Sequence, residues 1–155
     1  MRNKIKKILV ALDGSKNSFR GLDEAILLAR QAHATITGIY VKHMPAIYAI
    51  HPLGFLDVGM TKEAKKFLAS AKIRAAKKGI LFNSKLIGGG DPGFDIVKFA
   101  HNKKNKFDII VIGSRGMGSV KEFFLGSTSN YILHKSKIPV LIVKWGIENF
   151  GTTKN

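Results

Sequence analysis

Apolar runs that alternate with amphipathic helical patterns constrain the fold of this chain more than any other feature of its sequence. Five short runs rich in Val, Ile, Leu and Phe recur, at Ile5–Leu12, Thr35–Val41, Ile80–Ile87, Phe107–Ile112 and Val140–Val143. The first, fourth and last of them contain nearly continuous apolar stretches. Continuous apolar strands are typical of parallel sheets that are covered by helices on both faces. We therefore predict five strands, three of them buried on both faces.

Helical patterns fill the spaces between these runs. Apolar residues recur with the helical period in four segments, which are Ser15–His33, Thr61–Lys78, a helix opened by Asp91-Pro92, and about Gly126–Lys135. Asp91 is a typical N-cap with Pro92 at the first helical position, and Gly79 suits a helix stop. Phe94 is expected on the buried side of the third helix and Leu133 on that of the fourth.

Strands that alternate with helices predict an α/β fold, here a five-stranded parallel sheet flanked by helices with right-handed crossovers. The length of 155 residues fits one domain over residues 1–145, followed by a frayed tail over 146–155. Lys42–Gly59 is the one long irregular segment expected, and it is either a functional loop or a mobile excursion. The strand Pro139–Val143 is expected at a sheet edge, where an exposed apolar strand invites pairing.

Composition excludes several classes of protein. The chain has no cysteine, which excludes a disulfide scaffold, a thiolate zinc site and a cysteine nucleophile. No apolar stretch approaches the roughly 20 residues that span a bilayer. The apolar run after the basic N-terminus is too short for a signal peptide. These features predict a cytoplasmic protein without membrane insertion.

The charge balance is unusual. The chain has 26 Lys and Arg against 10 Asp and Glu, a formal net charge of +16, and such a field attracts anions. Many of the basic residues lie in the Thr61–Lys78 segment, where they are either a solvated helix face or a surface for weak nucleic-acid binding. Nucleic-acid modules normally add stacking aromatic residues or a groove-entering element, and the sequence has neither.

A glycine-rich segment after the fourth apolar run is the strongest candidate for a binding site, because ligands of open parallel sheets bind beyond the carboxyl ends of the strands. Its glycines let a ligand approach the backbone, and the fourth helix begins just after them, with N–H groups that suit phosphate. Ser127, Thr128 and Ser129 add hydroxyl groups, and Arg115 could add a cationic fork. The alternative is that the glycines only make turns and that Ser127 caps the helix. The segment is neither a Walker A loop nor a Rossmann fingerprint.

The spacing Gly113-x2-Gly116-x9-Gly126-Ser127 resembles the nucleotide signature of the universal stress protein A family. Blocks at Ile8–Ser15, Phe107–Gly116 and Ile138–Val143 resemble the first, fourth and last strands of that family with their turns, in the same order. The resemblance covers nearly the whole chain. It implies a Rossmann-like fold of the adenine nucleotide alpha hydrolase-like type.

The resemblance also implies that the protein binds ATP, accompanied by Mg²⁺. The positions that match the family's binding residues are Ala11, Asp13, Val41, Ile112, Gly113, Arg115, Gly116, Gly126, Ser127 and Thr128. Asp13 matches the carboxylate near the ribose and the metal-bound phosphates, and Val41 matches the residue whose backbone meets adenine. Arg115 stands where His is also common, and Ala11 where Pro or Ala occurs. A homodimer through Pro139–Val143 is implied as well.

Three functions remain in competition at this point. The first is a stress-response or signalling protein in which bound ATP alters conformation or partner binding. The second is a slow ATP hydrolase, although no catalytic base is identified, since Asp13 is expected near the metal rather than near an attacking water. The third is a basic protein that binds nucleic acid or anionic surfaces. Of the five histidines, His43 and His51 are candidates for the pocket.

Overall fold

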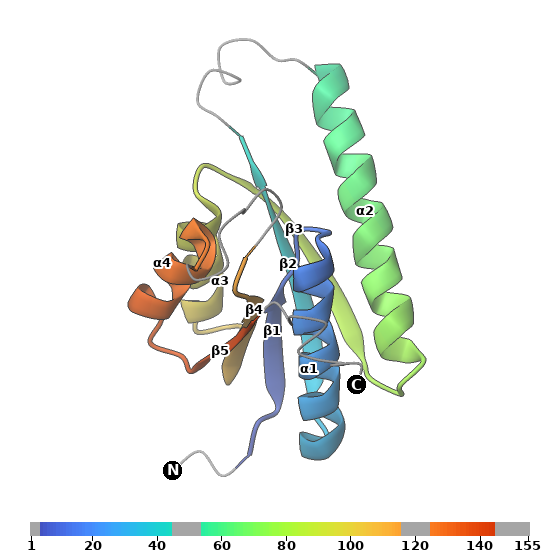
Figure 1. Cartoon of the computed structure of the whole chain (residues 1–155), viewed down its shortest axis with the longest axis vertical. Coiled ribbons are helices and arrows are strands. Elements are labelled where there is room, and N and C mark those ends of the chain that lie inside the picture. Colours follow the sequence, from blue (N-terminus) through green and yellow to red (C-terminus); the bar gives the residue numbers. More distant parts are fainter. Residues whose placement is uncertain (1–3, 45–53, 116–124, 145–155) are drawn as a thin grey trace, which may run out of the picture.

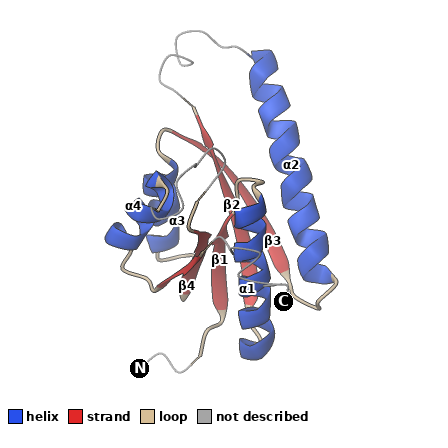
Figure 2. Ribbon diagram, viewed as in Figure 1, coloured by secondary structure: helices blue, strands red, loops and turns tan. Residues whose placement is uncertain are grey.

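The computed structural model of the chain describes residues 4–44, 54–115 and 125–144, with the backbone alone for 54–60. Its elements, in chain order, are β1 (Lys7–Ala11), α1 (Lys16–Ala32), β2 (Thr35–His43), α2 (Gly54–Ala76), β3 (Phe82–Gly89), α3 (Pro92–His101), β4 (Ile109–Gly113), α4 (Ser127–Lys135) and β5 (Val140–Val143) (Figures 1 and 2). The strands form one parallel sheet with the order β3-β2-β1-β4-β5. The predicted fold class is therefore confirmed.

The sheet is the middle layer of three. Helices α1 and α2 cover one face and α3 and α4 cover the other (Figure 1). Within β1, Ile8 and Val10 pack under α1 and α2, while Leu9 and Ala11 pack under α3 and α4. All four are buried, which confirms that this strand is covered on both faces, as its continuous apolar sequence predicts.

Strand β5 departs from that expectation. It lies at the sheet edge as predicted, with β4 as its one neighbour among the described strands. Val143 is buried, but Leu141 is 37% exposed. The apolar run therefore predicted the strand correctly. Its predicted burial on both faces is wrong, because an edge strand has half of the neighbours that a central strand has.

Helix α2 begins earlier than the sequence predicted. It starts at Gly54, whereas the helical pattern begins near Thr61, and β2 continues to His43. The irregular segment is therefore shorter than Lys42–Gly59, and its residues 45–53 lie outside the described residues. Glycine is a poor helix former, so the glycines near the start of α2 made this part of the sequence resemble a loop.

The expectation that Phe94 and Leu133 face inward is wrong, since these side chains are 50% and 44% exposed. In α3, Gly93 occupies the buried position instead. A Cβ added there would lie 2.9 Å from the Cβ of Tyr131 in α4, so the missing side chain lets the two helices approach closely. A hydrophobic stripe read from large side chains alone misses a buried glycine.

Two of the three glycines that precede Asp91 continue strand β3. Gly88 and Gly89 belong to β3 and pair with Lys42 and His43 of β2. Asp91 caps α3 as predicted, because its carboxylate accepts a hydrogen bond from the Phe94 N–H at 2.8 Å. In the described ranges, no helix is long and apolar enough to cross a membrane.

Candidate functional site

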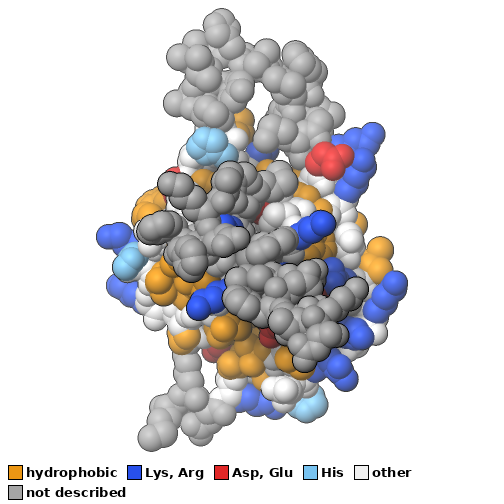
Figure 3. Space-filling model, in the orientation of Figure 1, with side chains coloured by type: hydrophobic (Ala, Val, Ile, Leu, Met, Phe, Trp, Pro, Cys, Tyr) orange, Lys and Arg blue, Asp and Glu red, His pale blue; other side chains and the backbone are white. Residues whose placement is uncertain are grey.

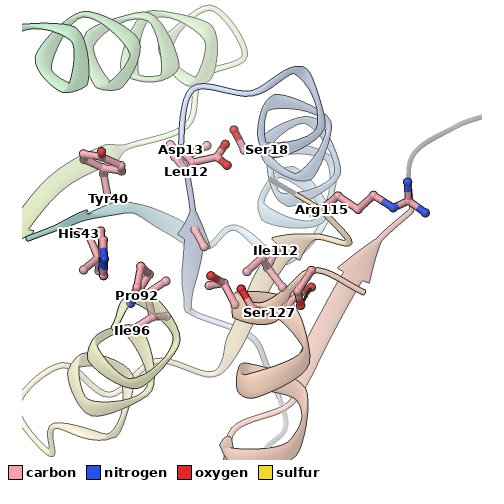
Figure 4. Close-up of a pocket in the computed structure, with 16 residues that line it drawn as sticks. Leu12, Asp13, Ser18, Tyr40, His43, Pro92, Ile96, Ile112, Arg115 and Ser127 are labelled. Carbon is pink, nitrogen blue, oxygen red and sulfur yellow. Dashed lines mark hydrogen bonds between the residues drawn. The ribbon is translucent and has the colours of Figure 1, made fainter. Parts of the chain in front are cut away.

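The strand order reverses between β1 and β4, because the chain leaves β1 toward β2 on one side and returns to β4 on the other. Such a switch point leaves a crevice outside the carboxyl ends of the two strands. Here the crevice is a cavity of about 480 Å³ (Figure 4). That volume lies within the roughly 300–1,000 Å³ typical of small-molecule sites.

The cavity gathers the predicted site residues from four parts of the fold. Those that line it are Ala11, Asp13, Val41, Ile112, Gly113, Arg115, Gly126, Ser127 and Thr128. Gly116 lies outside the described residues. The strand ends of β1, β2 and β4 and the start of α4 thus come together, although they are far apart in the sequence.

One end of the cavity is largely apolar. Val41 comes from the end of β2, and Pro92 and Ile96 come from the start of α3. His43 closes this end at the carboxyl end of β2, as Figure 4 shows. His43 is therefore a pocket residue as expected, whereas His51 lies outside the described residues.

The other end of the cavity is formed by the N-terminus of α4. The sequence allowed Ser127 to be the cap of this helix, but the N-cap is Gly126, and it makes no side-chain hydrogen bond to the first turn. Helices α1 and α3 differ in this respect, because Ser15 and Asp91 cap them with their side chains. The first turn of α4 therefore presents N–H groups without a side-chain cap at the cavity, beside the hydroxyls of Ser127 and Thr128.

Arg115 lines the cavity, but its guanidinium group extends away from Ser127 (Figure 4). The expected cationic fork toward the α4 N-terminus is thus not present in this conformation. The backbone of Arg115 has a separate role, since its carbonyl accepts a hydrogen bond from Asn17 Nδ2 at 2.9 Å. The described polar groups at this end are mainly N–H and hydroxyl groups.

Asp13 follows β1 and brings a carboxylate to the cavity. Its Oδ1 accepts a hydrogen bond from the Ser15 N–H at 2.9 Å. The turn between them passes through Gly14, whose φ of +84° favours glycine. This turn aims the carboxylate at the space beyond the strand ends and starts α1 immediately afterwards.

Tyr40 also lines the cavity, although the sequence pattern did not predict it there. Its ring packs edge-on against Phe67 of α2, with 5.1 Å between ring centroids. Burial raises the pKa of the Tyr40 phenol above 10.0, and the negative charge of Asp13 raises it further. The phenol is therefore neutral at physiological pH and keeps a hydroxyl hydrogen that it can donate in the cavity.

Asn17, in the first turn of α1, was also missed. It is 3% exposed, and its amide lies against Gly113 and Ser114 at the end of β4. The signal in the sequence was weak, because a polar residue in the first turn of a helix is common. Only the adjacency of β1 and β4 places it beside the glycine-rich turn.

The described residues contain no group of three or more His, Asp or Glu side chains that could hold a metal ion. Among the described residues that line the cavity, Asp13 is the one with a carboxylate. Mg²⁺ is commonly bound by one or two carboxylates together with the phosphates of a substrate. The residues present therefore suit a cation that arrives with a phosphorylated ligand rather than one held by the protein alone.

These features define a parallel α/β protein with helices on both faces and a small-molecule cavity at the switch point of its sheet. The model of the Universal stress protein family matches residues 4–144. The chain therefore belongs to the universal stress protein family.

Similar proteins agree with this assignment. Universal stress protein YxiE of Bacillus subtilis is 34% identical over 148 residues, which cover 89% of this chain and 98% of that protein. The solved structure of MJ0577, a universal stress protein of Methanocaldococcus jannaschii, matches with a TM-score of 0.80 and 28% identity, and the match covers 92% of this chain and 97% of that one. A universal stress protein from Archaeoglobus fulgidus, solved in complex with dAMP, matches with a TM-score of 0.65 and 25% identity over 88% of this chain and 96% of its own.

Proposed function

We propose that this universal stress protein binds ATP in the switch-point cavity and that the bound nucleotide alters its conformation or its binding of a partner in a stress response. The observation that carries the proposal is that all the predicted binding residues within the described ranges line one cavity. The complex of the Archaeoglobus fulgidus relative with dAMP supports an adenine nucleotide as the ligand class.

The two ends of the cavity suit the two ends of an adenine nucleotide. The apolar end, with Val41, Pro92 and Ile96, suits the flat base. The uncapped N-terminus of α4 suits phosphate, because its N–H groups and the helix dipole favour negative charge. Asp13, between the ends, would hold the ribose or share a Mg²⁺ ion with the phosphates.

We further propose a homodimer through β5. The strand is at a sheet edge and carries the partly exposed apolar Leu141. The opposite edge strand, β3, instead exposes the polar residues Asn83, Ser84 and Lys85. An apolar edge favours pairing with a second copy, whereas polar and charged residues at an edge discourage it.

Calorimetric titration with ATP and Mg²⁺ tests the binding proposal when wild type is compared with Gly126→Val. A first carbon added at Gly126 would have its nearest neighbour at 3.6 Å, which is an ordinary contact. The rest of the valine side chain would crowd the α4 N-terminus. We expect binding at least about tenfold weaker, equivalent to about 1.4 kcal/mol.

The matched control is Gly90→Val. A Cβ at Gly90 meets nothing within 4 Å, and Gly90 does not line the cavity. This variant should bind ATP like wild type. Equal ATP binding by wild type and Gly126→Val would refute the site, and absence of binding in wild type would refute the function.

A further inference from the structure

The side-chain amide of Asn17 connects α1 to the turn that follows β4. Its Nδ2 donates a hydrogen bond to the Arg115 carbonyl at 2.9 Å and a longer one to Ser114 Oγ at 3.5 Å. A carbonyl oxygen can only accept, so the nitrogen of the amide must be the atom that faces Arg115. The orientation of the Asn17 amide is thereby fixed.

The turn is shaped to receive this amide. A Cβ at Gly113 would lie 2.8 Å from Asn17 Nδ2 and 3.0 Å from its Cγ. No side chain larger than hydrogen fits at Gly113 unless Asn17 moves. The glycine at the end of β4 thus lines the cavity and also leaves the space that the Asn17 amide fills.

The same turn is bonded to the N-terminus of α4. The Ser114 carbonyl accepts hydrogen bonds from the Gly126 N–H at 2.8 Å and from Ser129 Oγ at 2.9 Å. Asn17 lies on one side of the Gly113–Arg115 turn and the first turn of α4 on the other. A displacement of the turn would therefore displace the N–H groups of α4.

Asn17 is a costly residue for this place. It is 3% exposed, and its Oδ1 has no hydrogen-bond partner among the residues that the structure describes. A buried polar atom without a partner reduces the free energy of unfolding. An apolar side chain of similar size would avoid that cost, which indicates that the amide serves the position of the turn.

We infer that Asn17 is a positioning residue for the phosphate-binding end of the cavity. It holds the Gly113–Arg115 turn, and through Ser114 the N-terminus of α4, in the arrangement that receives the phosphates. The apolar end belongs to β2 and α3 and does not depend on these bonds. The inference rests on the proposed function. It adds that different parts of the fold position the groups that bind the phosphates and the groups that bind the base.

The test compares the affinities of ATP and adenosine by calorimetry in wild type, Asn17→Ala and Asn17→Leu. The leucine variant fills the space of the amide and protects the measurement against a cavity that prevents folding. In both variants we expect ATP to bind about tenfold more weakly and adenosine within about twofold of wild type. A merely structural role would lower both affinities together.

The matched control is Asn105→Ala. Asn105 Nδ2 also donates to a backbone carbonyl, that of Phe99 at 2.8 Å, but Asn105 does not line the cavity. This variant should lower Tm without changing the ratio of the two affinities. Unchanged ATP binding, or equal losses for ATP and adenosine, in the Asn17 variants would overturn the inference alone. A wild type that binds neither ligand would refute the proposed function and the inference with it.

Discussion

At the scale of single residues, the cavity brings together Asp13, which follows β1, and Tyr40 of β2. Burial is the larger cause of the raised pKa of Tyr40, and the negative charge of Asp13 is the smaller one. A neutral phenol beside a carboxylate gives this part of the cavity both a donor and an acceptor. That combination suits the hydroxyl groups of a ribose.

The raised pKa of Tyr40 predicts a dependence of stability on pH. Because the folded state holds the phenol proton more tightly than the unfolded state does, this group stabilises the fold fully below pH 10.0 and loses that contribution as pH rises through the folded-state pKa. Tyr40→Phe removes this loss and keeps the ring packed on Phe67. The free energy of unfolding of the variant, relative to wild type, should therefore increase above about pH 10 in urea titrations. A difference that stays constant with pH would contradict the prediction.

Site residues at the strand ends could be predicted from the sequence, whereas site residues whose roles depend on the strand order could not. Asp13, Val41 and Ile112 each end an apolar run, so their place at one sheet edge follows from the pattern. Asn17 and Tyr40 lie inside elements, and their importance depends on which strands are neighbours. The periodicity of one sequence does not contain that information.

At the scale of whole elements, α4 and β5 carry most of the proposed function. Helix α4 presents an N-terminus without a side-chain cap at the cavity, and β5 presents an apolar edge. Ser114 lies between them, since its N–H donates to the Val143 carbonyl at 2.8 Å and its carbonyl accepts from Gly126. Ser114 thus hydrogen-bonds both to the proposed dimer strand and to the helix start that lines the cavity.

The dimer proposal predicts that Leu141→Lys shifts the protein toward monomer. A charge on an apolar edge strand opposes pairing with a second copy, and we expect the dissociation constant to rise at least about tenfold in sedimentation equilibrium. Leu81→Lys is the matched control, because Leu81 is more exposed, at 65%, and precedes the opposite edge strand β3. A wild type that sediments as a monomer, or equal effects of both substitutions, would refute the dimer through β5.

The element types were predictable from the alternation of apolar runs and helical patterns, but their lengths were less so. Helix α2 begins at Gly54 and β3 continues through Gly89, and in both places glycine resembled an interruption. A glycine ends an element only where the backbone requires it, as at Gly79, whose φ is +75°. Close packing accounts for Gly89, since a Cβ there would collide with the carboxylate of Asp95.

At the scale of the whole molecule, the net charge of +16 offers anions a second place to bind. The exposed basic side chains of α2 and the residues after it are Lys62, Lys65, Lys66, Lys72, Arg74, Lys77 and Lys78. Lys and Arg side chains gather over this helix in Figure 3. A nucleotide held by surface charge alone would bind over α2 rather than in the cavity.

The most direct measurement is a titration of methyl-labelled wild-type protein with ATP and Mg²⁺, followed by NMR. Val41, Ile96 and Ile112 report on the cavity, and Ile73, which is 58% exposed on α2, reports on the basic helix. Binding in the cavity predicts saturable shifts of the three cavity methyl signals and no shift of the Ile73 signal. Shifts of Ile73 with unchanged cavity signals would place the nucleotide on the charged surface and refute binding in the switch-point cavity.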